Sequence, residues 1–359
     1  MSRGRGAKIL RTHPTAVFVL LSLLVTLGLG AYSCRARRPA KDFVFSKEAF
    51  EAALVAPYDR DRIKEHYRRP VRVPLRKQTL RYRHAPTLAL GEKIFKDTRL
   101  ATAVGMGCVT CHQPDISYSD HKGQSAESTR RRSMTLHNLA WADSFTWDGG
   151  SGSLMSQAVL ALGAPGGMAT DGAALVARLS SFSEYSPLFA AAYVGPTMPG
   201  GETSFARAMW AIEVFVSSLV SGESTFDRWL RGDSTAISES AARGFDLFNT
   251  KAGCARCHMS WRFTDDKRHD LGLAEEVSVQ PPNRKFKTPG LREVSLRWPY
   301  MHDGSLAVLR DVLDFYNRGG GISRPTKSPL LLPGGLSPAE LGDLESFLRT
   351  LTATEPVAH

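Results

Sequence analysis

The sequence predicts a mainly α-helical protein that consists of two similar domains. Two pentapeptides share the pattern Cys-x-x-Cys-His, at Cys108–His112 and Cys254–His258. A short amphipathic segment with one glycine and an apolar pair precedes each pentapeptide, Leu90–Phe95 before the first and Arg243–Phe248 before the second. Few stretches alternate between apolar and polar residues as strands do. A duplicated helical unit accounts for these observations together.

The repeated pentapeptide has the spacing that attaches a c-type haem. Its two thiols add to the vinyl groups of the porphyrin, and the adjacent histidine binds the iron. One copy alone could be half of a zinc site or a redox dithiol, but two copies, each followed at once by histidine, favour haem. We therefore expect two cytochrome c-like domains, each built around one covalent haem c. The expected attachment residues are Cys108, Cys111, Cys254 and Cys257, and the expected iron ligands are His112 and His258.

Residues 1–40 predict a targeting segment rather than part of the fold. Basic residues precede an apolar run from Ala16 to Ala31, which is the pattern of a signal peptide or a membrane anchor. Cys34 suggests attachment as a lipoprotein, and an uncleaved anchor or a cleaved signal peptide are the alternatives. Because haem c is attached outside the bacterial cytoplasm in most such systems, we expect a periplasmic protein, with anchoring to the membrane through the N-terminus favoured.

The remaining chain divides into three segments. Residues 41–88, rich in proline and arginine, predict an extended tether and an N-terminal arm that lies on the first domain. Residues 89–235 predict the N-terminal cytochrome c-like domain, and residues 236–353 predict the C-terminal one. The net charge is +11, but the basic residues are scattered and no nucleic-acid motif accompanies them, so no nucleic-acid partner is expected. An acidic redox protein remains open as a partner.

Two longer helices are predicted outside the repeat. The stretch from about residue 204 to residue 220 carries apolar residues on a broad helical face. Near the C-terminus, Ser337, Pro338 and Glu340 provide an N-cap, a proline at the first helical position and a capping-box acid. We expect a helix from there to about residue 351, which closes the second domain.

The chain resembles the bacterial di-haem cytochrome c peroxidase and MauG family from about residue 90 to residue 351. Besides the two pentapeptides and the segment before the first, four further matches follow one another in the order of that family. They are Phe145–Gly149 with Gln157-Ala158 behind it, Phe226–Leu230, Phe286–Arg292 and Pro299–Ser305. Several matching segments in the right order are much more specific than any one motif.

The resemblance implies that the two haems have different tasks. In such proteins hydrogen peroxide reacts at the N-terminal haem, and the C-terminal haem passes electrons, with a tryptophan between the two. Trp147 matches that tryptophan, and Gln157 matches a residue in the pocket of the first haem. The electrons would come from a small cytochrome, a cupredoxin or a protein substrate.

The acid that helps to cleave peroxide in the family is replaced by Gly167. A group that moves the proton between the peroxide oxygens speeds that cleavage, and Asp171 is a nearby acid that could take its place. Two further functions stay open, of which Gly167 favours the first. The chain could be a non-catalytic di-haem electron-transfer cytochrome, or it could be a module that binds a diatomic gas at the first haem.

The sixth ligand of the second iron decides its chemistry. The peroxidases place a methionine there and MauG-like proteins a tyrosine, and the matching residue in this chain is Tyr316. A phenolate oxygen stabilises ferric and higher iron, whereas a thioether raises the reduction potential. Tyr316 also shares one face of a predicted helix with apolar residues and could simply pack there, and Met301 is the other ligand candidate. We expect His302 either beside the haem edge or in a purely structural turn.

Two more sites depart from the family pattern. The histidine that follows the first motif in the peroxidases is Ser128 here, and His121 and His137 are the other candidates nearby. Arg132 and Arg297 match positions that hold a calcium ion in the family. Calcium needs oxygen ligands, so we expect no calcium, and we expect one or both arginines to occupy the site or to pair with haem propionates.

Overall fold

The computed structural model of the chain describes residues 58–69, 84–123, 131–164, 167–194, 201–274 and 284–354. All of these residues belong to one compact unit, Lys47–His359, and the other unit, Met1–Ser46, lies wholly outside them. The predicted targeting segment, Cys34 and Ser128 therefore lie outside the described residues. Within the described ranges, no helix is both long enough and apolar enough to cross a membrane.

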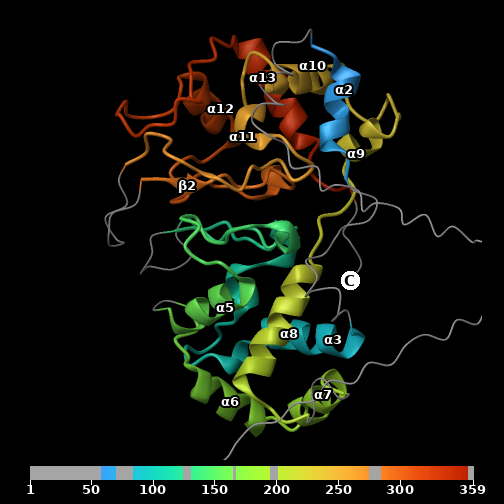
Figure 1. The fold of residues 1–359 in the computed structure, drawn as a ribbon, viewed down its shortest axis with the longest axis vertical. Coiled ribbons are helices and arrows are strands. Elements are labelled where there is room, and N and C mark those ends of the chain that lie inside the picture. Colours follow the sequence, from blue (N-terminus) through green and yellow to red (C-terminus); the bar gives the residue numbers. More distant parts are fainter. Residues whose placement is uncertain are drawn as a thin grey trace, which may run out of the picture. The chain divides into compact units, whose positions relative to one another are not determined.

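The described residues are mainly helical, as the sequence predicts (Figure 1). The α-helices are α2 (Arg60–Lys64), α3 (Ala85–Lys96), α4 (Cys108–Cys111), α5 (Leu154–Gly163), α6 (Gly172–Ser181), α7 (Tyr185–Ala192), α8 (Phe205–Ser218), α9 (Thr225–Leu230), α10 (Glu239–Asn249), α11 (Ala255–His258), α12 (Leu309–Asn317) and α13 (Pro338–Arg349). Short 3-10 helices lie between them: η1 (Glu65–Tyr67), η3 (Thr98–Leu100), η4 (Pro114–Ile116), η5 (Leu139–Trp141) and η6 (Val294–Leu296). The named strands of the described chain are β1 (Arg268–His269) and β2 (Phe286–Lys287), which pair antiparallel.

Both longer helices predicted outside the repeat are confirmed within a few residues. Helix α8 follows Ser204, whose hydroxyl accepts a hydrogen bond from the Arg207 N–H. Helix α13 follows Ser337, and the predicted capping box with Glu340 is present in full. These caps satisfy backbone donors that have no partner within the helix, which is why the helices begin where they do.

Two hydrophobic clusters form the core, and each contains one half of the sequence repeat. Leu90, Ile94 and Phe95 of α3 belong to the first cluster together with residues of α6, α7 and α8. Phe245 and Phe248 of α10 belong to the second, together with residues of α9, α12 and α13. The cysteines Cys108 and Cys254 pack against the first and the second cluster, respectively.

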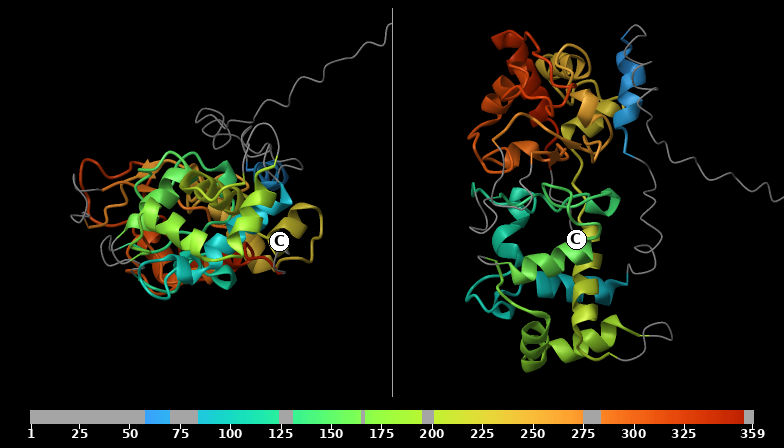
Figure 2. Two further views of the ribbon diagram at one scale, coloured as in Figure 1. Left: turned by 90° about the horizontal axis from the view of Figure 1, so that it is seen from below. Right: turned by 60° about the vertical axis from the view of Figure 1, so that its left-hand side comes forward.

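The repeated glycine lies at a helix crossing in both halves. Helices α3 and α8 lie side by side in Figures 1 and 2, and a Cβ atom on Gly91 would lie 2.0 Å from the carbonyl oxygen of Ala211 in α8. A Cβ atom on Gly244 of α10 would lie 2.0 Å from the carbonyl oxygen of Asp343 in α13. Only glycine permits such a close approach of two helix backbones. The sequence repeat therefore reflects the same helix contact, formed twice.

The described part of the N-terminal arm differs from the expectation. It is not extended, because residues 60–67 form α2 and η1, and it packs against the second cluster rather than on the first domain. Tyr67 is fully buried there and donates a hydrogen bond to Asn249 Oδ1 at 2.7 Å. Arg60 forms an ion pair with Asp246 of α10. Residues 58–69 contain no proline, and Tyr67 is held there by aromatic contacts with Phe245 and Phe263.

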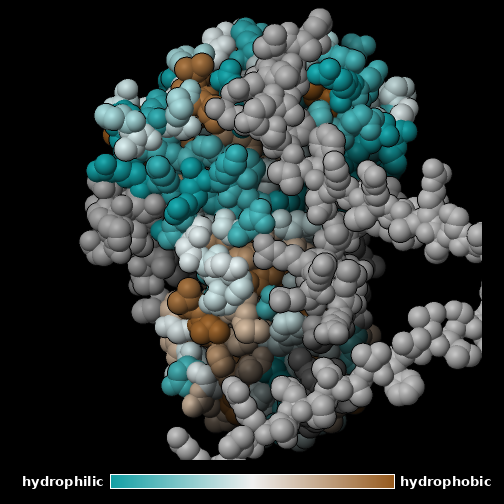
Figure 3. All heavy atoms as spheres, viewed as in Figure 1, coloured by the Kyte–Doolittle hydropathy of each residue, from teal (hydrophilic) through white to brown (hydrophobic). Residues whose placement is uncertain are grey.

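Exposed apolar side chains gather over α5, which Figure 3 shows in brown. Val159 is 40% exposed and Leu160 is 64% exposed. The opposite face of this helix packs against the first cluster through Leu154, Met155 and Ala158. Helix α5 therefore carries Gln157 close to the core of the first half, while Val159 and Leu160 of the same helix remain at the surface.

Candidate functional site

The first motif forms a short helix that presents its histidine in a fixed orientation. Cys108–Cys111 form α4, and His112 ends it. The Nδ1 atom of His112 lies 2.9 Å from the carbonyl oxygen of Tyr118, which accepts its proton. Burial lowers the pKa of the His112 imidazole, so the ring is neutral. Its Nε2 atom then keeps a lone pair that can bind a metal.

The second motif repeats this arrangement. The Nδ1 atom of His258 donates to the carbonyl oxygen of Phe263 at 2.7 Å, and burial lowers the pKa of this imidazole as well. The four cysteines of the motifs form no disulfides. Burial raises the pKa of the Cys108 and Cys254 thiols to about 12 in each case. Each motif therefore offers two free thiols and one oriented imidazole.

A cavity of about 190 Å³ adjoins the second motif. Cys254, Cys257 and His258 line it together with apolar side chains from α12 and from the segment around residue 330. The apolar residues of its wall include Phe248, Leu271, Leu309, Val312, Leu313, Leu330, Leu331 and Leu348. An apolar wall, two adjacent thiols and an imidazole whose Nδ1 is already bonded are the surroundings that a covalent haem needs, so these residues fit the group.

The first motif has the same donor set, and one observation supports the fit there. The Oε1 atom of Gln157, on α5, is buried and has no hydrogen-bond partner among the residues that the structure describes. Helix α5 packs against the cluster that also contacts Cys108 and Val109. A buried amide oxygen normally has a donor, and a bound group in this half could supply it.

Trp147 lines the cavity of the second motif and is held from two sides. Its indole Nε1 donates to the carbonyl oxygen of Arg132 at 2.9 Å. Its own carbonyl oxygen accepts from the Lys287 N–H, in β2, at 2.7 Å. The indole is therefore fixed between the residues that follow the first motif and the strand beside the second.

Both candidates for the sixth ligand reach the same cavity. Tyr316 lies on α12, on the face that Leu309, Val312 and Leu313 also present to the cavity, and Met301 lines it from the loop before that helix. Burial raises the pKa of the Tyr316 phenol well above its ordinary value. His302 also lines the cavity and stacks on Phe286, with ring centroids 4.0 Å apart.

The other candidates around the first motif are engaged elsewhere. His121 Nε2 lies 3.0 Å from the carbonyl oxygen of Leu296. His137 Nδ1 lies 3.0 Å from the Ser117 hydroxyl, and its ring packs edge-on against Tyr118, whose carbonyl holds His112. Asp171 caps α6 by accepting from the Ala174 N–H at 2.8 Å.

Arg132 and Arg297 are buried and bind backbone oxygens. The Arg132 guanidinium lies 3.0 Å from the Asp120 carbonyl and 3.3 Å from the Lys122 carbonyl. Arg297 donates to the Gly290 and Arg292 carbonyls at 2.7 and 3.0 Å. Because a guanidinium repels a metal cation and already uses carbonyl oxygens that could bind one, these residues do not fit a calcium site.

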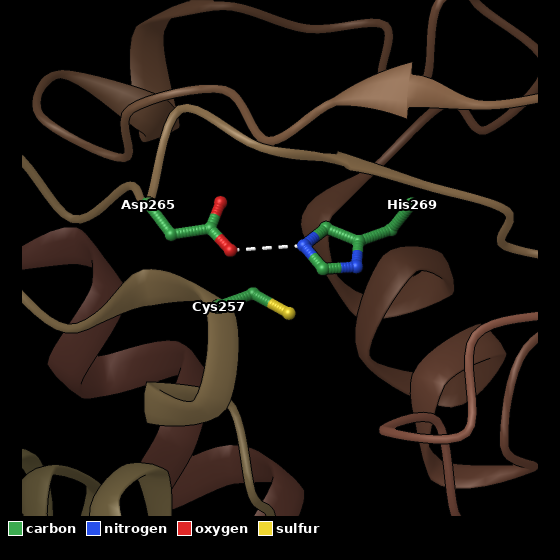
Figure 4. Close-up of side chains that lie close together, drawn as sticks. All are labelled: Cys257, Asp265 and His269. Carbon is green, nitrogen blue, oxygen red and sulfur yellow. Dashed lines mark hydrogen bonds and ion pairs between the residues drawn. The ribbon is translucent and has the colours of Figure 1, made fainter. Parts of the chain in front are cut away.

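A further cluster beside the second motif was not predicted from the sequence. Cys257, Asp265 and His269 bring one ligand atom each to within 4.8 Å of one another (Figure 4). The hydrogen bond from His269 Nε2 to Asp265, 2.9 Å long, and a second one to Cys257 raise the pKa of the imidazole to about 10. Because Cys257 belongs to the haem motif, only two ligands would remain for a metal ion. The i, i+4 spacing of Asp265 and His269 was the one sequence signal.

The comparisons with known proteins agree with this geometry. The profile of the di-haem cytochrome c peroxidase family matches residues 85–235. The methylamine utilization protein MauG of Methylorubrum extorquens is 40% identical over 327 residues, which cover 87% of this chain and 90% of that protein. The cytochrome-c peroxidase IdrP1 of Denitromonas iodatirespirans is 34% identical over 322 residues, covering 77% of this chain and 84% of that protein.

Solved structures show the same fold. A MauG-like protein associated with microbial copper homeostasis superposes with a TM-score of 0.69 at 29% identity, over 81% of this chain and 95% of that chain. The diheme peroxidase BthA from Burkholderia thailandensis gives a TM-score of 0.63 at 20% identity, over 76% of this chain and 87% of that one, a likeness of fold alone. The extent and identity of the matches to curated relatives establish that this chain belongs to the di-haem cytochrome c peroxidase and MauG family.

Proposed function

We propose that the protein is a di-haem oxidoreductase in which each Cys-x-x-Cys-His motif holds one covalent haem c in its own helical domain. The two hydrophobic clusters, each in contact with one motif, support this arrangement. The predicted domain bounds of 89–235 and 236–353 change in two places, because α3 already begins at Ala85 and the buried residues of α9 (Thr225–Leu230) pack in the second cluster. Bound haem would supply an iron that exchanges single electrons and, where its sixth position is open, reacts with hydrogen peroxide.

One observation carries the proposal for the second haem. Cys254, Cys257 and His258 line the same cavity as Trp147 and Tyr316. His258 would hold the iron through Nε2, because its Nδ1 is committed to the Phe263 carbonyl. Tyr316 would be the second protein ligand, because it lies on α12 and lines the same cavity. Trp147 is the residue through which electrons pass between the two haems, since its indole is fixed at the edge of this cavity.

At the first haem, the chain leaves the sixth position without histidine. His121 contacts the Leu296 carbonyl and His137 the Ser117 hydroxyl, which supports an open iron that would react with peroxide without prior reduction. Gln157 would donate a hydrogen bond to an oxidant bound there, but its amide cannot move a proton as a carboxyl does. Gly167 provides no side chain, and Asp171 is used as a helix cap. Peroxide turnover is therefore expected to be slow, with a small cytochrome, a cupredoxin or a protein substrate as the source of electrons.

Gly167 also favours the second candidate function, a di-haem cytochrome that carries electrons without catalysis. Both functions require the two haems, but only the oxidoreductase reacts productively with peroxide. For either function, we propose a periplasmic location in which the N-terminal segment anchors the protein. We also propose that Arg132 and Arg297 occupy the place of a calcium ion.

The decisive experiment adds hydrogen peroxide to the fully ferric protein without reducing it first. A stoichiometric change of the haem absorption spectrum, without loss of the haem, is expected. Slow bleaching would instead establish the electron carrier, and a reaction only after partial reduction would point to a histidine on the first iron. Ferric electron paramagnetic resonance should show one high-spin and one low-spin haem, whereas two low-spin signals would contradict an open first iron.

The ligand of the second iron is tested by two matched substitutions in the same cavity. Tyr316→Phe should change the low-spin ferric spectrum, and Tyr316→Met should raise the reduction potential of one haem. Tyr300→Phe is the control, because Tyr300 also lines the cavity but its hydroxyl donates to the Val294 carbonyl at 3.2 Å. Equal spectra for Tyr316→Phe and Tyr300→Phe would remove Tyr316 from the iron and favour Met301.

A further inference from the structure

One tryptophan of this chain lies at the surface although it is next to the cavity of the second motif. Trp298 is 48% exposed, whereas the side chains of the other five tryptophans, all within the described residues, are more buried. Residues close to it in the sequence reach inward, because Arg297, Tyr300 and Met301 all line the cavity. The indole is therefore an aromatic group at the surface, attached to a segment that forms the wall of the haem site.

The indole is also held in one orientation. Its ring stacks on the imidazole of His121, with centroids 3.8 Å apart and planes inclined by 20°. His121 is itself anchored, since its Nε2 lies 3.0 Å from the carbonyl oxygen of Leu296. Stacked aromatic rings at this spacing are in van der Waals contact and give the exposed ring a defined position.

Hydrogen bonds connect the backbone of Trp298 to the tryptophan inside. The Arg132 guanidinium lies 3.4 Å from the carbonyl oxygen of Trp298. The carbonyl oxygen of Arg132 accepts from the indole Nε1 of Trp147 at 2.9 Å. A single buried residue therefore bridges the two tryptophans, one facing the cavity and one facing solvent.

We propose that Trp298 is the surface residue through which a redox protein outside the molecule delivers single electrons to the haem site. This inference rests on the proposed reaction with peroxide, which supplies the oxidant. Trp298 gives up one electron to the oxidised interior, and its indole N–H proton passes to water. The partner protein then returns one electron, and water returns the proton. Reduction of one hydrogen peroxide to two water molecules takes two electrons and two protons, so this sequence runs twice for each peroxide.

His121 is a positioning residue in this scheme. It holds the indole ring by stacking and does not itself exchange electrons. A partner too large to enter the cavity then has one defined aromatic contact at the surface.

The test compares two substitutions of similar size and different redox chemistry. Trp298→Tyr keeps a side chain that can lose one electron and one proton, whereas Trp298→Phe does not. After mixing the ferric holoprotein with peroxide and no reductant, electron paramagnetic resonance should show an indolyl radical in the wild type, a tyrosyl radical in Trp298→Tyr, and neither at this site in Trp298→Phe. Peptide mass spectrometry should find added oxygen at residue 298 of the wild type, and much less at Trp210, which lies on α8 in the first half.

Oxidation of a reduced mono-haem cytochrome c is the second readout. Its rate should fall at least about tenfold in Trp298→Phe, equivalent to about 1.4 kcal/mol of activation free energy, and recover in Trp298→Tyr. Trp210→Phe is the control and should behave as the wild type. A normal spectral change with peroxide, together with equal rates for Trp298→Phe and Trp298→Tyr, would overturn the role of Trp298 and leave the proposed function intact. Absence of any spectral change in the wild type would overturn the proposed function itself.

Discussion

Substitution of the repeated glycine tests whether the helix crossing holds each half together. In Gly244→Ala, the new Cβ atom would lie 2.0 Å from the Asp343 carbonyl oxygen and 2.8 Å from the Phe347 Cβ atom. Real Cβ contacts are essentially never shorter than 3.0 Å, so α10 and α13 must move apart by at least 1.0 Å. The obstructing oxygen belongs to a helix backbone and cannot turn away as a flexible side chain could.

The expected free energy follows from two opposing effects. Overpacking of this kind typically costs about 1–3 kcal/mol, and more where backbones collide. Alanine in place of glycine inside a helix contributes about 1 kcal/mol of stability. Because a backbone oxygen is in the way, the cost lies at the upper end of this range, about 3 kcal/mol, and after the helix gain of about 1 kcal/mol Gly244→Ala should destabilise the protein by about 2 kcal/mol.

Gly342 provides the matched control. It lies in α13, one residue before Asp343, and a Cβ atom there meets nothing within 4 Å. Gly342→Ala should therefore stabilise the protein by up to about 1 kcal/mol. Urea denaturation of the oxidised holoproteins, followed by far-UV circular dichroism, measures both. Equal unfolding free energies for the two variants would refute the backbone contact between α10 and α13.

Three further predictions concern the surroundings of the haem sites. Burial acts to raise the pKa of Asp270, but the hydrogen bonds from Arg324 and Thr326 outweigh it and lower this pKa to about 2. Since the folded-state pKa lies below the unfolded value of about 3.9, the contribution to stability is complete above about pH 4 and is lost as the pH falls toward 2. Asp270→Asn should lower the free energy of unfolding by about 2 kcal/mol at neutral pH. It should also flatten the dependence of that free energy on pH between 4 and 2, which urea titrations between pH 7 and pH 2 would measure. An unchanged pH dependence would speak against the ion pair of Asp270 with Arg324. Gly167→Glu should speed peroxide consumption at least about tenfold, because acid–base catalysis contributes about 10²–10⁴, and Gly167→Gln, equal in size but without an acid, should not. Addition of calcium or of a chelator should leave the thermal midpoint unchanged, whereas Arg132→Gln should lower it; a midpoint raised by calcium would restore a metal site.

Much of the local structure was accessible from the sequence because its causes are local. The capping residues of α13 and the apolar face of α8 lie within a few positions of the backbone groups that they affect, so their helices could be predicted closely. The two pentapeptides likewise contain both thiols and the histidine within five residues. The repeated glycine was visible as a pattern, but its reason was not, because the carbonyl oxygens that exclude a side chain come from α8 and α13.

Only the tertiary structure decided which distant residues share a site. Tyr316 and Met301 line one cavity with His258, and the ring of His121 stacks on Trp298. Tyr67 of the N-terminal arm packs in the second hydrophobic cluster instead of the first. These outcomes depend on how helices pack over long separations in the chain, where burial and shape outweigh local preference. By itself, the sequence determined that the chain carries two haem motifs on similar helical units, because those signals are short-range. The tertiary structure made the two motifs distinguishable, because each acquires its neighbours only through packing.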